Sequence, residues 1–189
     1  MAWKKSGAKK TYTEAMLYEY AVGALGRRMR TVAELKRLMR TRAGHQENCD
    51  LLVESVTARL KEQRYLNDTS YASSYSAYRR DTEKFGRIRV AQDLKAKGVH
   101  PDVVGKTIEE AYSEVDEEKL ARDFASRKRL KQPKDQKEAA RIFRMLARAG
   151  FSSRIIVLLL RNWNVEDETL CALEQEREMA EQAPSFEDE

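Results

Sequence analysis

The sequence predicts an all-α protein built from three tandem three-helix repeats that form an elongated, curved array. The first observation behind this prediction is that the stretch 94–99 recurs as 146–151, 52 positions later, and each copy ends a helical pattern at a glycine. The second is that apolar residues recur with helical spacing from residue 15 to residue 163. The third is that only 3 prolines and 8 glycines are present, whereas strand-and-turn architectures use many. A repeat period of about 50 residues favours an array of small helical units over a single catalytic pocket.

The first repeat is expected over residues 12–67, after a flexible, lysine-rich basic arm at 1–11. Thr31 and Glu34 have the spacing of a capping box, in which each side chain accepts a hydrogen bond from the backbone N–H of the other residue. A helix therefore begins at this point, and Gly44 ends it. The apolar faces expected for the three helices are Ala15, Tyr18, Val22 and Leu25; then Val32, Leu35, Leu38 and Met39; then Leu52, Val56 and Leu60.

The second repeat is expected over residues 68–115. Tyr71, Tyr75 and Tyr78 fall at i, i+4 and i+7, so they share one helix face. Such an aromatic stripe is more often part of a core than a platform on which bases stack, and both interpretations stay open. Gly86 separates this helix from the next one, and Pro101 stands where the first residue of a helix is expected. The two later helices bear the apolar faces Ile88, Ala91 and Leu94, then Val104, Ile108 and Ala111.

The third repeat is expected over residues 116–165. It opens with acidic residues at 116–118, which favour a helix N-terminus, and Pro133 interrupts the pattern after its first helix. Ser152 is placed to cap the last helix, whose segment 155–160 is apolar on all sides and should be the most buried. Nine helices are therefore expected in all. The apolar faces of this repeat are Leu120 and Phe124; then Ala139, Ile142, Leu146 and Ala149; then Ile156, Leu159, Leu160 and Trp163.

The charge of the chain is strongly polarised. Residues 166–189 form an acidic C-terminal tail with ten acidic residues and a single basic one, Arg177, which gives a net charge of −9. Because the whole chain carries +5, residues 1–165 carry +14. A strongly basic body favours a polyanionic partner such as nucleic acid or a nucleoprotein. The tail either only improves solubility or folds back and competes for the basic surface.

Sequence signals of catalysis, metal binding and membrane insertion are missing. Cys49 and Cys171 match no metal-ligand spacing and are expected to be reduced thiols, while His45 and His100 read as loop residues. We find no phosphate-binding loop, no dinucleotide fingerprint and no nucleophile elbow. Neither a signal peptide nor an apolar run of about 18 residues is present. We therefore expect a cytoplasmic protein that is not an enzyme and that needs no cofactor or metal.

Basic residues cluster at matching places in the three expected repeats. Any one cluster could be an ordinary solvated helix face, but stacked repeats would align the three into one concave basic stripe. Such a stripe could follow a phosphate backbone or a row of acidic side chains without reading sequence. Sequence-specific reading of DNA is a weaker alternative, because the helices that would enter a groove begin with acidic or apolar residues. The clusters are centred on Arg27 to Arg42, Arg79 to Lys97, and Arg122 to Arg148.

The order of several short motifs resembles the RecX family, bacterial regulators of the RecA recombinase. The resemblance covers roughly residues 12–165, and the arm and the tail lie outside it. The chain departs from the family pattern at Arg64, where a glycine is usual, at Asn67, where an aspartate is usual, and at Phe85-Gly86-Arg87, which replaces Lys-Gly-Pro. The motifs are Ala24-Leu25-Gly26-Arg27-Arg28 with Thr31 and Glu34-Leu35; Gln63 to Asp68 with Tyr71-Ala72 and Tyr75; Gly86 to Arg89 with Leu94 and Lys97-Gly98-Val99; and Leu146 with Gly150-Phe151-Ser152.

The resemblance implies a fold of three three-helix repeats that lies in the groove of a RecA–single-stranded-DNA filament. Binding there would lower the ATPase, strand-exchange and co-protease activities of RecA, and thereby affect recombination, DNA repair and the SOS response. Two alternatives stay open: a non-sequence-specific DNA-binding protein that affects RecA only by competing for DNA, and a helical scaffold for another partner. The protein is expected to act as a monomer, with at most weak binding to bare DNA. The expected central contacts are Arg79, Arg87, Arg89, Lys95 and Lys97, extended by Arg27, Arg28, Arg141, Arg144 and Arg148.

Overall fold

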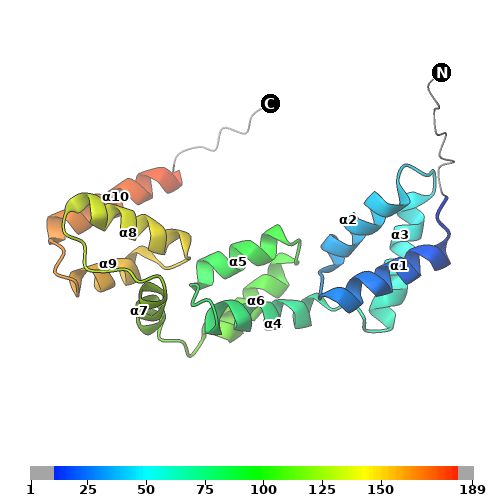
Figure 1. Ribbon diagram of the computed structural model, residues 1–189, viewed down its shortest axis with the longest axis horizontal. Coiled ribbons are helices and arrows are strands. Elements are labelled where there is room, and N and C mark those ends of the chain that lie inside the picture. Colours follow the sequence, from blue (N-terminus) through cyan, green and yellow to red (C-terminus); the bar gives the residue numbers. More distant parts are fainter. Residues whose placement is uncertain (1–10, 183–189) are drawn as a thin grey trace, which may run out of the picture. The chain divides into compact units, whose positions relative to one another are not determined.

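The protein is all-helical in the computed structural model, which describes residues 11–182 (Figure 1). Over these residues the chain forms ten helices and no strand. The all-α class predicted from helical spacing and from the scarcity of proline and glycine is therefore confirmed. The helices are α1 (Glu14–Arg27), α2 (Val32–Ala43), α3 (Cys49–Glu62), α4 (Asp68–Asp81), α5 (Arg87–Ala96), α6 (Pro101–Tyr112), α7 (Glu117–Arg127), α8 (Gln136–Arg148), α9 (Ser153–Arg161) and α10 (Asp167–Gln182).

The chain divides into two compact units. Unit 1 comprises Met1–Ala72 and Leu94–Val103, and unit 2 comprises Ser73–Asp93 and Val104–Glu189. The boundaries pass through three helices. The first residues of α4 and α6 and the last residues of α5 belong to unit 1, and the rest of each helix belongs to unit 2. The three-repeat division at residues 67 and 115 stays a prediction, and residues 1–10 of the predicted basic arm (1–11) lie outside the described residues.

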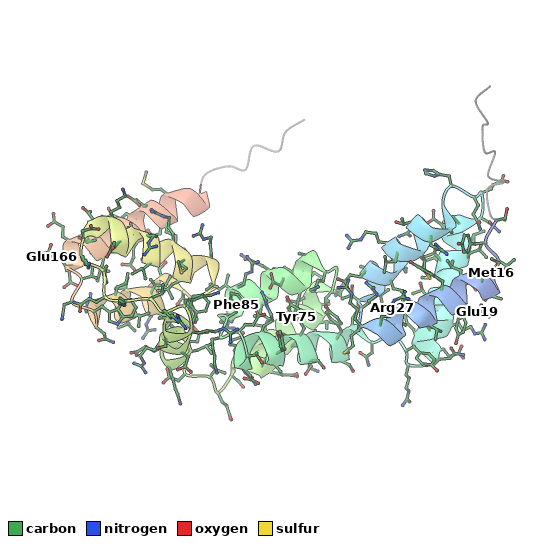
Figure 2. All side chains as sticks on the ribbon, viewed as in Figure 1. Met16, Glu19, Arg27, Tyr75, Phe85 and Glu166 are labelled. Carbon is green, nitrogen blue, oxygen red and sulfur yellow. The ribbon has the colours of Figure 1, made fainter. Side chains whose placement is uncertain are left out.

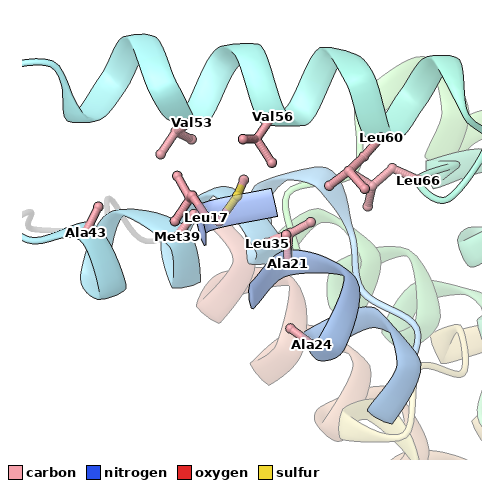
Figure 3. Close-up of a cluster of buried hydrophobic side chains, with 10 residues drawn as sticks. All are labelled: Leu17, Ala21, Ala24, Leu35, Met39, Ala43, Val53, Val56, Leu60 and Leu66. Carbon is pink, nitrogen blue, oxygen red and sulfur yellow. The ribbon is translucent and has the colours of Figure 1, made fainter. Parts of the chain in front are cut away.

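The core of unit 1 is a cluster of aliphatic side chains from α1, α2 and α3 (Figure 3). The capping box is present: the Thr31 hydroxyl accepts from the Glu34 N–H at 3.1 Å, and the Thr31 N–H donates to the Glu34 carboxylate at 3.4 Å. Aliphatic residues at helical spacing on α2 and α3 fill the cluster as the sequence pattern predicted. The cluster comprises Leu17, Ala21, Ala24, Leu35, Met39, Ala43, Val53, Val56, Leu60 and Leu66.

The predicted inner face of α1 was wrong by about one residue. The helix buries Leu17, Ala21 and Ala24, whereas Ala15 is exposed and Tyr18 is half-buried. Two alanines on the inner face allow α1 to approach its neighbours closely, and the larger side chains then cover the edge of the core. The tyrosines predicted to share one face of α4 also differ in exposure, since Tyr71 is buried but Tyr78 is 54% exposed.

In unit 2, α7, α8, α9 and α10 pack around a second apolar core. The predicted faces of α7 and α8 are buried, and Ile156, Leu159 and Leu160 of α9 are at most 1% exposed. Trp163, also predicted on the buried side, follows the end of α9 and is half-buried. The nine-helix prediction was one helix short, because Asp167–Gln182 forms α10 within the acidic tail. The Leu170 and Leu173 side chains of this helix are buried, and the helix packs on α8 and α9. The high density of charge in the tail concealed this short apolar pair.

The two copies of the repeated glycine motif form equivalent turns. Gly98 follows α5 with φ +77°, and Gly150 follows α8 with φ +92°, a backbone region that side chains with a Cβ rarely adopt. In unit 1 the Thr31 hydroxyl donates to the Lys97 carbonyl at 2.6 Å, so the turn rests on the N-terminus of α2. In unit 2 the Ile88 N–H donates to the Gly150 carbonyl at 3.3 Å, so the turn rests on the N-terminus of α5. The repetition in sequence therefore marks a repeated joint between helices.

The Tyr112 phenol gives a prediction on pH dependence. Burial raises its pKa above the usual value, and its O–H donates to the Phe85 carbonyl at 2.9 Å. Below a pH of about 10 the phenol is protonated in both the folded and the unfolded protein. Above that pH only the unfolded protein releases the proton, so the free energy of unfolding that Tyr112 contributes falls as pH rises. We expect Tyr112→Phe to cost about 1 kcal/mol in urea unfolding at pH 7, and the gap from wild type to narrow above pH 10. A gap that does not change with pH would contradict this assignment.

Candidate polyanion-binding surface

Potential metal ligands among the described residues do not gather into a site. Over residues 11–182, no group of three or more His, Cys, Asp or Glu side chains could hold a metal ion. His45 and His100 are exposed, Cys49 is half-buried and Cys171 is exposed, and both cysteines are free thiols. In the same range no helix is long and apolar enough to cross a membrane.

Arg79 is enclosed by its own unit. It lies in the last turn of α4, is 16% exposed, pairs with Glu83, and contacts Asp93 at 2.6 Å. Its guanidinium carbon lies 4.2 Å from the centre of the Phe85 ring, a cation–π distance. Figure 2 labels Phe85 in the loop after α4. The structure thus gives Arg79 a packing role that its sequence neighbours do not reveal.

Asp93 of α5 is the residue that sequence reasoning missed. Its carboxylate is 15% exposed and accepts from Arg79 at 2.6 Å and from the Tyr75 hydroxyl at 3.1 Å. It also pairs with Arg89 at 3.0 Å. The i, i+4 spacing of Arg89 and Asp93 was the one signal available in the sequence.

This carboxylate gives a prediction on stability. We expect Asp93→Asn to lower the free energy of unfolding by about 2 kcal/mol, because it weakens two hydrogen bonds and one further ion pair to a half-buried group. Asp102→Asn is the matched control, since the Asp102 side chain is 91% exposed, and it should change stability little. Urea denaturation of both variants checks this, and an equal effect of the two substitutions would contradict it.

Arg87 and Arg89 begin α5 and reach solvent. Arg87 is exposed, and the Arg89 side chain is 44% exposed even though it pairs with Asp93. Asp93 therefore orients the Arg89 guanidinium without covering it. These two cations are available to an anionic partner.

The arginines of α8 share one exposed face. Arg141, Arg144 and Arg148 fall at i, i+3 and i+7 and are all exposed, while Ile142 and Leu146 are buried. Arg144 and Arg148 also line one hollow together with Arg89 of α5. The structure therefore brings together three of the predicted contact residues, which come from segments about 55 positions apart in the sequence.

The remaining predicted residues belong to unit 1. Arg27 at the end of α1 (Figure 2), Arg28 and Lys95 are exposed. Lys97 is 28% exposed and contacts Glu34 at 3.2 Å. Burial alone would lower the pKa of Lys97, but hydrogen bonds with Tyr71 and Glu34 outweigh that effect and raise it. One continuous stripe through all ten residues, six of which lie in unit 2, stays a prediction.

Comparisons with known proteins give consistent similarities. The family description "RecX, second three-helix domain" matches residues 67–108. The "Regulatory protein RecX" of Pseudomonas entomophila is 31% identical over 152 residues, which cover 78% of this chain and 91% of that protein. The protein of the same name from Myxococcus xanthus is 40% identical over 105 residues, which cover 53% of this chain and 56% of that protein.

The chain spans about half the length of some relatives: its match to the Lactococcus lactis "Regulatory protein RecX" covers 52% of that protein, at 30% identity, and 74% of this chain. Among solved structures, RecX from Lactobacillus salivarius aligns with a TM-score of 0.62 at 20% identity, over 80% of this chain and 96% of that one. A second crystal structure of a regulatory protein RecX aligns with a TM-score of 0.64 at 22% identity, over 77% of this chain and 70% of that one. These two structures are similar in fold.

Proposed function

This chain belongs to the RecX family of regulatory proteins, and from that premise we propose that it regulates the RecA recombinase by binding the RecA–single-stranded-DNA filament. It lies in the filament groove and lowers the ATPase, strand-exchange and co-protease activities of RecA. It acts in the cytoplasm, as a monomer, by binding rather than by catalysis, and it needs no cofactor.

The observation that carries this proposal is the set of exposed arginines that a helical scaffold holds in unit 2. Arg87 and Arg89 on α5, and Arg144 and Arg148 on α8, are all exposed. A filament groove lined by DNA phosphates and acidic side chains is the kind of partner that such a surface attracts. The charge of +14 on residues 1–165 acts in the same direction.

We assign the predicted contact residues two different roles. Eight of them are exposed and contact the filament directly. Arg79 and Lys97 hold other groups in place, since Arg79 fixes Asp93 beside Arg89, and Lys97 joins the Gly98 turn to Glu34. The direct contacts are Arg27, Arg28, Arg87, Arg89, Lys95, Arg141, Arg144 and Arg148.

A second candidate function is non-sequence-specific binding to DNA, with RecA affected only through competition. The arginine-lined hollow favours this candidate as well, because phosphates would occupy it equally in bare DNA. Salt dependence does not separate the two, since both interactions are electrostatic.

The affinities for bare and for RecA-coated single-stranded DNA separate the two functions. With a labelled oligonucleotide, at one salt concentration, we expect the RecA-coated form to bind at least about tenfold more tightly, a difference of about 1.4 kcal/mol. Equal or weaker binding to the coated form would replace the proposal with the competition mechanism.

A further inference from the structure

We propose that the hollow between α5, α8 and α10 is a binding site for a nucleotide of single-stranded nucleic acid. Four arginines line it: Arg89 from α5, Arg144 and Arg148 from α8, and Arg177 from α10. Its volume is about 530 Å³. That volume lies within the range of roughly 300–1,000 Å³ that is typical of small-ligand sites.

Each wall of the hollow is positioned by packing that the structure shows. Asp93 orients Arg89 at 3.0 Å, and the i, i+4 spacing of Arg144 and Arg148 on α8 points both toward one side. The α10 wall is fixed because Leu173 is 5% exposed and Arg177 donates to the Phe151 carbonyl at 3.3 Å. The helices that carry the site are therefore held by packing, and from them the exposed Arg144 and Arg148 side chains reach the hollow.

Arg177 is the one basic residue among the ten acidic residues of the segment 166–189. In a helix with so many carboxylates, this arginine nevertheless lines a hollow that already holds three other arginines. Four guanidiniums that line one hollow give it a positive potential, which attracts an anion. The placement of Arg177 is thus an observation on α10, independent of the repeats, that points to an anionic ligand.

The apolar part of the lining decides between a nucleotide and an acidic peptide. Phe143 and Leu173 line the hollow but are only 2% and 5% exposed, whereas Ile88 is 36% exposed and offers apolar surface to a ligand. A carboxylate side chain would leave the apolar surface of Ile88 wet, whereas a nucleotide brings a phosphate for the guanidiniums and a flat base that covers Ile88. A duplex keeps its bases stacked, so the ligand is an unstacked nucleotide of a single strand.

Glu176 is the one carboxylate among the described residues that line the hollow. It stands next to Arg177 on α10 and opposes the charge that the arginines supply. Removing its charge should therefore strengthen binding, while removing an arginine weakens it. A purely structural role for these side chains would not produce such opposite signs.

This inference rests on the proposed function for its setting, because the filament presents single-stranded DNA. Its test needs only the full chain and an oligonucleotide, so the two proposals can fail separately. The probe is a fluorescein-labelled oligo-thymidylate, and its anisotropy gives the affinity at several salt concentrations.

We expect Arg144→Gln/Arg148→Gln to weaken binding and to lower the slope of log affinity against log salt by up to about 0.7, since the one phosphate that these guanidiniums hold contributes about 0.7 on a single strand. Glu176→Gln should strengthen binding about two- to fivefold. Arg154→Gln, an exposed arginine of α9 outside the hollow, is the matched control and should leave the slope near that of wild type.

Three results would overturn the inference. The first is no binding of the oligonucleotide by the wild-type protein at low salt. The second is an equal change of slope per arginine removed in Arg154→Gln and in the double variant. The third is unchanged oligonucleotide binding by the double variant together with loss of RecA inhibition, which would make acidic protein side chains the ligand. Weakened oligonucleotide binding with full RecA inhibition would support the site while counting against the proposed function.

Discussion

The Gly150→Ala variant is expected to lose about 3 kcal/mol of unfolding free energy, because strain and overpacking add at this position. Gly150 has φ +92°, and a Cβ there would lie 2.3 Å from the Arg89 nitrogen. Since the obstacle is backbone at the start of α5, it cannot move aside without disturbing that helix. Urea denaturation should show a midpoint lower by about 1–2 M.

Two other glycines provide the comparison for this prediction. A Cβ on Gly86 would lie 2.2 Å from the Gly150 carbonyl oxygen, so Gly86→Ala should be similarly destabilising. Gly105 lies within α6 with nothing within 4 Å of an added Cβ, and alanine there should stabilise the protein by about 0.5–1 kcal/mol. If Gly150→Ala and Gly105→Ala unfold at the same midpoint, the turn after α8 is not the joint that we describe.

Charge reversal at the start of α5 is expected to have the largest functional effect. In Arg87→Glu/Arg89→Glu, two cations that face solvent become anions and would repel a polyanionic groove. We expect at least about tenfold more protein to be needed for half-inhibition of RecA, which corresponds to a loss of about 1.4 kcal/mol or more. The measurement is RecA-catalysed ATP hydrolysis with the variant titrated into preformed filaments.

The control for this variant makes the same change of charge elsewhere in unit 2. Lys106→Glu/Arg154→Glu replaces two exposed cations on α6 and α9 that are not among the proposed contacts. Its inhibition should stay close to that of wild type. A thermal melt of both variants separates lost contact from lost folding, and a folded Arg87→Glu/Arg89→Glu protein that inhibits like wild type would remove α5 from the proposed surface.

Local signals in the sequence predicted most of the helices. The Thr31 and Glu34 capping box, the glycine turns and the apolar faces of α2, α3, α8 and α9 depend on residues a few positions apart, and short-range patterns determine such features. The repetition of Leu94–Val99 in Leu146–Phe151 was informative because each turn needs a glycine for the same geometric reason.

Features that depend on tertiary contacts could not be predicted in this way. Arg79 looked like its neighbours in a basic cluster, and only the approach of α5 brings Asp93 to it. The helix α10 was missed because two buried leucines sit among many carboxylates. Arg177 lines the same hollow as the arginines of α5 and α8 because α10 packs beside them. The sequence pattern did not indicate this packing.

The most direct test of the central claim is the single-stranded-DNA-dependent ATP hydrolysis of RecA, titrated with this protein from sub-stoichiometric to equimolar ratios with DNA in excess. Binding to the filament predicts inhibition at well below one copy per RecA. The contrary result is no inhibition until the protein is abundant enough to coat the DNA, which would mean that it acts only by competing for DNA.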